Sequence, residues 1–251
     1  MSKAVRQTVG PEVPRPDEGA DKAAAVQRMF GAVAPRYDLL NHLLSLNIDR
    51  RWRRLAVDRL LAGAPARGLF LDACAGTLDL AVELASRPAF QGRVIATDFA
   101  LPMLLHGVSK VRSLPVYPAC GDALRQPLRN RSIDGAMVAF GIRNLASIDS
   151  GLREFARLLR PGAPLVILEF STPAWQPFRF LYETYFHRIL PRVGRLISRH
   201  DSAYDYLPAS VAAFPTPPQL ADRIRDAGFD RVQWRALSGG IAALHSALRA
   251  A

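Results

Sequence analysis

Short apolar segments alternate with helical patterns through the middle of the chain, and this alternation restricts the possible folds more than any other feature. The segments are almost continuously apolar, which is typical of strands buried on both faces of a parallel sheet. The predicted strands are "GLFLDAC" (68–74), "GRVIATD" (92–98), "LPVYPAC" (114–120), "IDGAMVAFG" (133–141) and "PLVILEF" (164–170). Helices are predicted near 79–87, 101–112 and 147–160. The pattern therefore predicts an α/β fold with a parallel sheet covered by helices.

The pattern changes after Phe170. An aromatic, basic helical segment spans about 176–200, and the proline-rich "FPTPPQ" and a helix through Ala227 follow it. Two further strand candidates, "FDRVQWRAL" and "GIAALHSAL", are joined by Ser238-Gly239-Gly240, which predicts an antiparallel hairpin. The complete sheet is then expected to have seven strands, doubly wound and mostly parallel.

The 251 residues fit one domain with small additions. Residues 1–22 carry proline, glycine and charges without a hydrophobic signal core, so we expect a disordered lead-in. Residues 23–251 are expected to form a single domain. Within it, 23–61 is predicted to be an N-terminal helical cap and 171–216 a helical lid insert.

The formal net charge of +11 comes almost wholly from arginine. Such an excess favours a polyanion or an anionic membrane surface as a partner, although a coding bias would also leave the arginines scattered as they are. We find no compact basic patch and expect no nucleic-acid partner. The histidines show no metal-ligand spacing, so no metal is expected. The oligomeric state stays open.

Two cysteines, Cys74 and Cys120, lie near predicted strand ends and have neither disulfide nor metal spacing. We expect both to be buried free thiols in a reducing cytoplasm. No apolar run approaches the roughly 18 residues that a membrane span needs. The expected location is therefore the cytoplasm. Peripheral contact with the inner face of the membrane is compatible with this location.

Acidic residues lie at the ends of the first three predicted strands. In an open α/β sheet the ligand binds beyond the carboxyl ends of the strands, which places Asp72, Asp98 and Asp122 around one pocket. A carboxylate at Asp98 suits a ribose diol, and Asp122 could accept from an adenine amino group. Each acid could instead cap a helix. Together they favour a cationic ligand over a pyrophosphate, and the chain has no G-x-G-x-x-G turn for a dinucleotide.

Several sequence blocks resemble a known group of enzymes. They are "FGAVAPRYDLLNHLLSLNIDRRW" (30–52), "LDACAGTLDL" (71–80), "TDFALPML" (97–104), "FGIRNL" (140–145), "RLLRPGAPLVILEFSTP" (157–173), "AYDYL" (203–207) and "GGIAALH" (239–245). The order of elements resembles the class I S-adenosylmethionine-dependent methyltransferases, which have a Rossmann-like fold. The blocks narrow the resemblance to the ubiquinone/menaquinone biosynthesis C-methyltransferases.

The resemblance implies S-adenosyl-L-methionine as cofactor and methylation of a ring carbon on a polyprenylated demethylquinol. Conversion of demethylmenaquinol to menaquinol is the first expectation, and a benzoquinol substrate stays open. A nucleic-acid methyltransferase is disfavoured because no Asn-Pro-Pro-aromatic signature follows the fourth strand. The expected chemistry is an in-line attack by the ring carbon on the sulfonium methyl group, for which alignment of the two centres supplies much of the rate.

Two groups of site residues follow from the strand ends and from the resemblance. The expected cofactor-binding group is Asp72, Gly76, Thr77, Asp98, Asp122, Ala123 and Ala139. The expected reaction face is Tyr37, Asp38, Arg143, Asn144 and Tyr204. The acceptor phenol must lose a proton to become a good carbon nucleophile. Arg143 can stabilise the phenolate but cannot act as a base, so Asp38, or a water that it orients, would take the proton.

The chain departs from the family pattern at four positions. Leu78 replaces the second glycine of the cofactor turn, Asp49 replaces a histidine, and Ala163 and Ala203 replace a glycine and a serine. A leucine beside the methionine moiety is expected to crowd it. Two interpretations stay open: a shifted turn that still binds the cofactor, or a divergent non-catalytic paralogue that binds lipid quinone or acts as a scaffold. The three surviving acids favour retained binding.

The insert sequence "WQPFRFLYETYFHRILPRVGRLISRH" mixes aromatic residues with arginine on a helical pattern. It could cover the quinone ring and touch anionic lipid while the prenyl tail stays in the membrane. An ordinary lid helix that packs on the sheet is the alternative.

Overall fold

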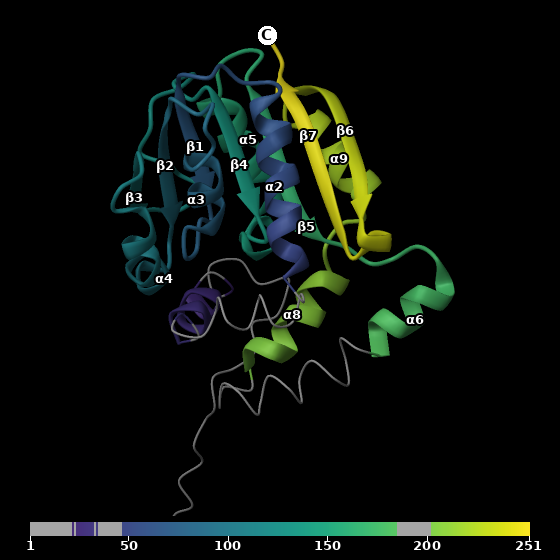
Figure 1. Cartoon of the computed structure of the whole chain (residues 1–251). Helices are drawn as coiled ribbons and strands as arrows, with labels where there is room; N and C mark the ends of the chain where they lie inside the picture. Colours follow the sequence, from purple (N-terminus) through teal and green to yellow (C-terminus); the bar gives the residue numbers. More distant parts are fainter. Residues whose placement is uncertain (1–21, 23, 33, 35–46, 185–201) are drawn as a thin grey trace, which may run out of the picture.

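The structure is a computed structural model that describes residues 22, 24–32, 34, 47–184 and 202–251 (Figure 1). In this part of the chain one sheet contains seven strands in the order β3-β2-β1-β4-β5-β7-β6. The strands are β1 (Leu69–Ala73), β2 (Arg93–Asp98), β3 (Val116–Cys120), β4 (Gly135–Ala139), β5 (Pro164–Phe170), β6 (Phe229–Leu237) and β7 (Ala242–Arg249). Strands β1 to β5 pair in parallel, and β7 runs antiparallel to both β5 and β6. The predicted fold class is confirmed.

Helices cover both faces of the sheet, with α2 in front of the strands and α5 and α9 behind them in Figure 1. The helices are α2 (Ile48–Leu61), α3 (Asp79–Ala85), α4 (Leu101–Gly107), α5 (Ile148–Leu158) and α9 (Pro217–Asp226). On β1, Phe70 packs with the α2 and α3 side, and its neighbour Leu71 packs with the α5 and α9 side. Because successive strand residues point to opposite faces, a sheet buried on both faces needs continuously apolar strands.

The strand bounds lie within two residues of prediction, and the larger differences have local causes. Strands β5 and β6 begin and end where predicted. Strand β4 ends at Ala139 because Phe140 adopts a left-handed conformation with φ 56°. At the other end of β4, Ile133 makes only an isolated bridge to Leu159. Strand β3 begins at Val116, since the Leu114 amide closes a turn onto the Val111 carbonyl, 3.0 Å away.

The predicted hairpin between β6 and β7 is confirmed, with its turn at Ser238–Gly240. Gly239 and Gly240 have φ values of 72° and 100°, which glycine adopts without steric cost. A Cβ added at Gly239 would lie 2.7 Å from Cε1 of Phe178, so packing also requires glycine there. These two glycines therefore turn the chain and admit the aromatic ring that packs on it.

Both cysteines are free thiols. Cys74 is half-buried, but Cys120 is exposed at the end of edge strand β3, so the expectation of two buried thiols is wrong for Cys120. The position of β3 at the edge of the sheet explains this error. The outer strand of a sheet has a neighbour on one side only, and the helices cover it incompletely.

Further helical segments lie beyond the carboxyl ends of the strands, at the bottom of Figure 1. They are residues 24–32, α6 (Gln176–Thr184) and α8 (Ser202–Ala212). Val26 and Met29 of the first segment pack against Tyr206 of α8. This packing brings the N-terminal region and the insert together over the edge of the sheet where a ligand is expected.

Candidate active site

A cavity of about 400 Å³ lies at the carboxyl ends of β1, β2 and β4. This volume is within the range of small-molecule sites. Its walls include five of the predicted residues and one aromatic residue from the N-terminal helical segment: Gly76, Asp98, Asp122, Ala123, Asn144 and Phe30. Two of the three strand-end acids, Asp98 and Asp122, therefore line one cavity, as the sequence predicted.

The turn after β1 is the part of this site that departs most from a glycine-rich loop. Cys74, Gly76 and Leu78 have φ values of 54°, 54° and 71°, so three of five consecutive residues are left-handed. The Leu78 amide closes the turn onto the Ala75 carbonyl, 2.8 Å away. The turn thus forms with a leucine where the family pattern has glycine, at a cost of about 1–2 kcal/mol for a side chain in this conformation.

Leu78 does not crowd the cavity, so that expectation is wrong. Its side chain is fully buried in the core cluster with Trp52 and Leu84, and Leu78 is not among the described residues that line the cavity. As the first residue before α3, it points back into the core beneath the helix instead of toward the ligand side. Leu78 therefore contributes to stability.

Replacing Leu78 with glycine is expected to lower the free energy of unfolding by about 2–4 kcal/mol, because the lost side chain leaves a core cavity and only part of that loss is offset by relief of the left-handed backbone. Affinity for the cofactor should change less than about twofold. Denaturant unfolding and titration calorimetry measure the two effects. Leu105→Ala, at a position that is 63% exposed, is the control. A large loss of affinity with unchanged stability would mean that Leu78 acts on the ligand after all.

Asp98 holds the turn and faces the cavity. Its Oδ2 accepts from the Gly76 amide at 2.8 Å, and its Oδ1 accepts from the Ala100 amide at 2.8 Å. Burial raises the pKa of Asp98, and these backbone amides together with that of Phe99 oppose the rise. Each carboxylate oxygen can accept a second hydrogen bond, so the group can hold the loop and still bind a diol.

Asp122 and Asp72 differ in their relation to the cavity. Asp122 lines it and accepts from the Leu124 amide at 2.9 Å, an Asx-type turn that fixes the carboxylate. Asp72 is buried within β1, and its Oδ2 has no hydrogen-bond partner. Burial raises the pKa of Asp72 well above its usual range, and the negative charge of Asp98 adds to the rise. Asp72, Thr77 and Ala139 are not among the described residues on the cavity wall.

A cationic adenosine ligand fits this set of residues. Two carboxylates lie on the wall, and Asp72 behind the turn is a buried carboxyl group with an unsatisfied oxygen. A site with these groups attracts positive charge and repels a pyrophosphate. In the described part of the chain, no group of three or more His, Cys, Asp or Glu residues could hold a metal ion.

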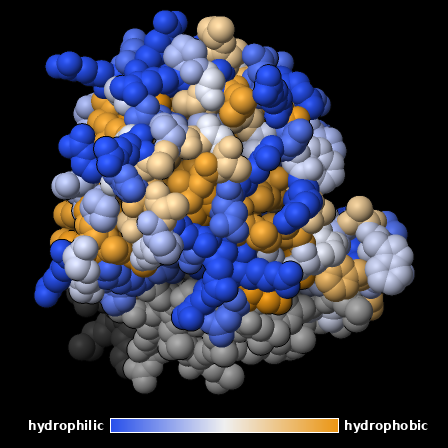
Figure 2. Space-filling view, turned by 45° about the horizontal axis from the view of Figure 1, so that its top comes forward, coloured by the Kyte–Doolittle hydropathy of each residue, from blue (hydrophilic) through white to orange (hydrophobic). Residues whose placement is uncertain are grey.

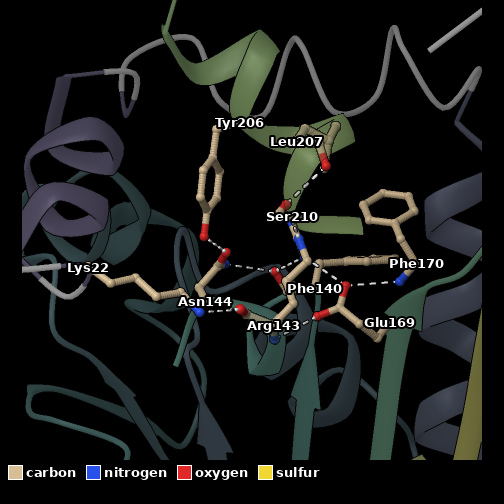
Figure 3. Close-up of polar contacts among 9 residues, drawn as sticks. All are labelled: Lys22, Phe140, Arg143, Asn144, Glu169, Phe170, Tyr206, Leu207 and Ser210. Atoms are coloured by element: carbon tan, nitrogen blue, oxygen red, sulfur yellow. Dashed lines mark hydrogen bonds and ion pairs between the residues drawn. The ribbon is translucent and has the colours of Figure 1, made fainter. Parts of the chain in front are cut away.

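The loop after β4 forms the other side of the site. Its short helix η2 (Ile142–Asn144) places Asn144 on the cavity wall, while Arg143 is buried beside it with 7% exposure. Nη1 of Arg143 donates to the Phe140 carbonyl at 2.5 Å and to Oε1 of Glu169 at 2.7 Å (Figure 3). The predicted reaction-face residues Arg143 and Asn144 are therefore brought together at the cavity.

Residues 18–249 match the sequence profile of the ubiE/COQ5 methyltransferase family. The chain belongs to this family. It is 46% identical to a demethylmenaquinone methyltransferase of Deinococcus radiodurans over 226 residues, which are 89% of this chain and 92% of the relative. It is 42% identical to the ubiquinone/menaquinone biosynthesis C-methyltransferase UbiE of Geobacter sp. strain M21, over 90% of this chain and 97% of that protein.

A solved structure agrees on the fold. A SAM-dependent methyltransferase of Thermotoga maritima, described as a possible histamine N-methyltransferase, has a TM-score of 0.59 and 17% identity, and the match covers 89% of this chain and 99% of that one. As a member of the ubiE/COQ5 methyltransferase family with a class I fold, the chain is an S-adenosyl-L-methionine-dependent methyltransferase.

One departure from the pattern of the ubiE/COQ5 methyltransferase family has a structural account. Asp49, in place of a histidine, is buried in α2 and bonded to Arg53 one turn later. The Arg53 guanidinium lies over the Phe140 ring, 5.8 Å from its centroid. The nearby Trp52 packs in the core and donates from Nε1 to Ser238 Oγ at 3.0 Å. Asp49 therefore neutralises a buried arginine beneath the loop after β4.

Three residues at this site were missed by sequence reasoning. Glu169 is the penultimate residue of the fifth strand, within an otherwise apolar segment whose pattern predicts only burial. Tyr206 donates to Oδ1 of Asn144 at 3.0 Å, whereas the prediction chose Tyr204, whose side chain lies outside the described part. Lys22 donates to the carbonyls of Arg143 and Leu145 at 3.2 and 3.0 Å. Nothing in the local sequence signals the role of Lys22.

Tyr37 and Asp38 lie outside the described residues. Their places on the reaction face stay predictions.

Proposed function

We propose that this chain transfers a methyl group from S-adenosyl-L-methionine to a ring carbon of a polyprenylated demethylquinol, with demethylmenaquinol as the preferred acceptor, in quinone biosynthesis. One observation carries the proposal: the loop after β4, with Arg143 and Asn144, lies next to a cavity that is lined by two carboxylates. The relatives of Deinococcus and Geobacter, whose names state this type of substrate, support it.

We assign cofactor binding to seven residues: Asp72, Gly76, Thr77, Asp98, Asp122, Ala123 and Ala139. Asp98 would accept from the ribose hydroxyls and Asp122 from the adenine side, and the buried Asp72 would offer its unpartnered Oδ2 behind the turn. When bound, the cofactor supplies an electrophilic methyl group on a sulfonium. Phe30 on the cavity wall excludes water from that side.

The reaction face is assigned to Tyr37, Asp38, Arg143, Asn144 and Tyr204. The Arg143 guanidinium stabilises the negative charge of the acceptor phenolate. Because its position near the cavity is fixed, it does so without reorganisation. Asn144, held by Tyr206, orients the acceptor. Asp38, or a water bonded to it, takes the phenol proton.

Two measurements test the function. Purified protein with S-adenosyl-L-methionine labelled in its methyl group and demethylmenaquinol in detergent should yield labelled menaquinol, identified by mass spectrometry. Titration calorimetry should show cofactor binding to the folded protein. Binding without transfer to any demethylquinol, or no binding at all, would overturn the proposal and favour the non-catalytic lipid-binding alternative.

We propose further that residues 23–61 act as a cap, that 171–216 act as a lid, and that the lid contacts an anionic membrane on its cytoplasmic side. Trp175 and Phe180 at α6 are 70% and 71% exposed, and Arg179 lies between them in sequence. Helix α6 protrudes from the body with hydrophobic residues on its surface (Figure 2). Among the described residues, no helix combines the length and hydropathy needed to cross a bilayer.

Trp175→Ser combined with Phe180→Ser is expected to weaken binding to phosphatidylglycerol-containing vesicles by about tenfold or more, because exposed aromatic side chains anchor amphipathic segments at the membrane interface. Vesicle sedimentation at two salt concentrations measures this. Trp234→Ser, at a 43% exposed tryptophan on β6, is the matched control. If the double variant binds vesicles as tightly as the parent protein, α6 is not the contact.

A further inference from the structure

Glu169 is a buried carboxylate in contact with Arg143 that the assigned chemistry does not use. It is the penultimate residue of β5 and is 1% exposed. Its Oε1 accepts from Arg143 Nη1 at 2.7 Å and from the Phe170 amide at 2.9 Å, and its Oε2 faces the Arg143 main-chain amide at 3.4 Å. One carboxylate therefore contacts both the backbone and the guanidinium of Arg143.

The remaining neighbours of the guanidinium restrict it further, as Figure 3 shows. Its Nη1 also donates to the carbonyl of Phe140, whose left-handed backbone ends β4. Its Cζ lies 5.4 Å from the centre of the Phe170 ring, and that ring packs on Phe140 with centroids 4.6 Å apart. On the insert side, Arg143 Nε approaches Ser210 Oγ at 3.4 Å. Residues of β5, of α8 and of the loop after β4 thus all contact the Arg143 guanidinium.

A gain in folding stability does not by itself explain the buried Arg143–Glu169 ion pair. Removing two charges from water costs about as much as their attraction returns, and well-packed apolar residues often replace a buried pair without loss. Burial raises the pKa of Glu169, and the charge of Arg143 opposes this rise. The pair lies where the loop after β4 meets the end of β5.

We infer that Glu169 is a positioning residue that fixes the orientation of the Arg143 guanidinium for the acceptor phenolate. This inference rests on the proposed function. Glu169 reaches the reaction only through Arg143, because Arg143 lines a second cavity of about 220 Å³ beside Tyr206 and Ser210, whereas Glu169 is not among the described residues on the wall of either cavity. A guanidinium held at a fixed angle presents its positive charge without reorganisation, and an error of about 1 Å in such a group costs about 100-fold in rate.

The test is a double-mutant cycle. Glu169→Gln keeps the size and an acceptor oxygen, and is expected to lower kcat by about 10- to 100-fold with little change in cofactor affinity. Added to Arg143→Leu, the same change should cost less than about twofold more, since its effect passes through Arg143. Multiplicative losses in the double variant, or full activity of the folded Glu169→Gln protein, would overturn the inference.

Nuclear magnetic resonance gives a readout that needs no turnover. In the parent protein the Arg143 guanidinium nitrogens should give separate signals from slow rotation, identified by their loss in Arg143→Lys. They should average in Glu169→Gln. Unchanged restraint in Glu169→Gln would overturn the positioning role even if the protein methylated no demethylquinol, so the two proposals fail separately.

Asp134→Asn is the matched control for both measurements. Asp134 likewise binds an arginine, Arg160, and a backbone amide, that of Leu69 at 2.8 Å, but it does so at the amino-terminal edge of the sheet. The Asp134→Asn variant should have the kcat and the Arg143 guanidinium signals of the parent protein. Comparable losses in Asp134→Asn would show that any arginine–carboxylate contact has this effect and would remove the special role of Glu169.

Discussion

Arg143→Leu is expected to lower kcat for demethylquinol methylation by about 10²- to 10³-fold while the cofactor dissociation constant changes less than about twofold. In the proposed reaction the guanidinium would stabilise the phenolate that forms when the acceptor loses its proton, and removal of one preorganised donor typically has an effect of this size. Arg143 is buried beside the cavity and does not line it, so cofactor binding should be spared. Steady-state kinetics and calorimetry on the same preparation check both statements.

The leucine variant leaves Glu169 buried without its cation, which can cost about 3–5 kcal/mol of stability. Arg143→Lys separates this loss from the catalytic one, because it keeps a positive charge near Glu169 while losing the planar donor geometry. It should melt close to the parent protein and still lose most of its turnover. If Arg143→Lys and Arg143→Leu both turn over at the parent rate, Arg143 is structural.

Asp98→Ala is expected to raise the dissociation constant for S-adenosyl-L-methionine by about 100-fold. The substitution removes the hydrogen bonds to the ribose and also the two that hold the Gly76 and Ala100 amides, so the turn after β1 loses its internal support. Titration calorimetry measures the loss. Asp98→Asn retains an acceptor oxygen and should be less severe.

Asp58→Ala is the control for Asp98. Asp58 is an exposed carboxylate of α2 that pairs with Arg87 at 2.9 Å, remote from the cavity wall. It should bind the cofactor as the parent does. Parent-like affinity in Asp98→Ala would mean that the second strand end is not part of the cofactor site, and the assignment of the cavity would have to be abandoned.

Periodicity was enough to predict the framework, because each strand and helix carries its own burial pattern. The apolar run at 164–170 and the alternation at 229–237 set the bounds of β5 and β6 correctly. Backbone conformation was harder to predict from the sequence. The predicted fourth strand continued to 141 through an apolar Phe140, since hydropathy does not reveal that this phenylalanine is left-handed and ends the strand.

Side-chain direction was the main source of error at the site. Leu78 was expected beside the ligand because a leucine replaced a glycine in a cofactor turn. The left-handed backbone instead sends its side chain into the core. The position of Leu78 in the motif therefore predicted the turn correctly, but it predicted the wrong environment for the Leu78 side chain.

The sequence by itself determined the doubly wound sheet, the hairpin and the three strand-end acids, because these follow from local periodicity and from the rule that parallel strands end at one edge. The tertiary structure alone decided that Glu169 and Tyr206 hold Arg143 and Asn144. Those contacts join residues 26 and 62 positions apart. A buried charge finds its partner through the packing of separate strands and helices, and no local pattern encodes which partner that will be.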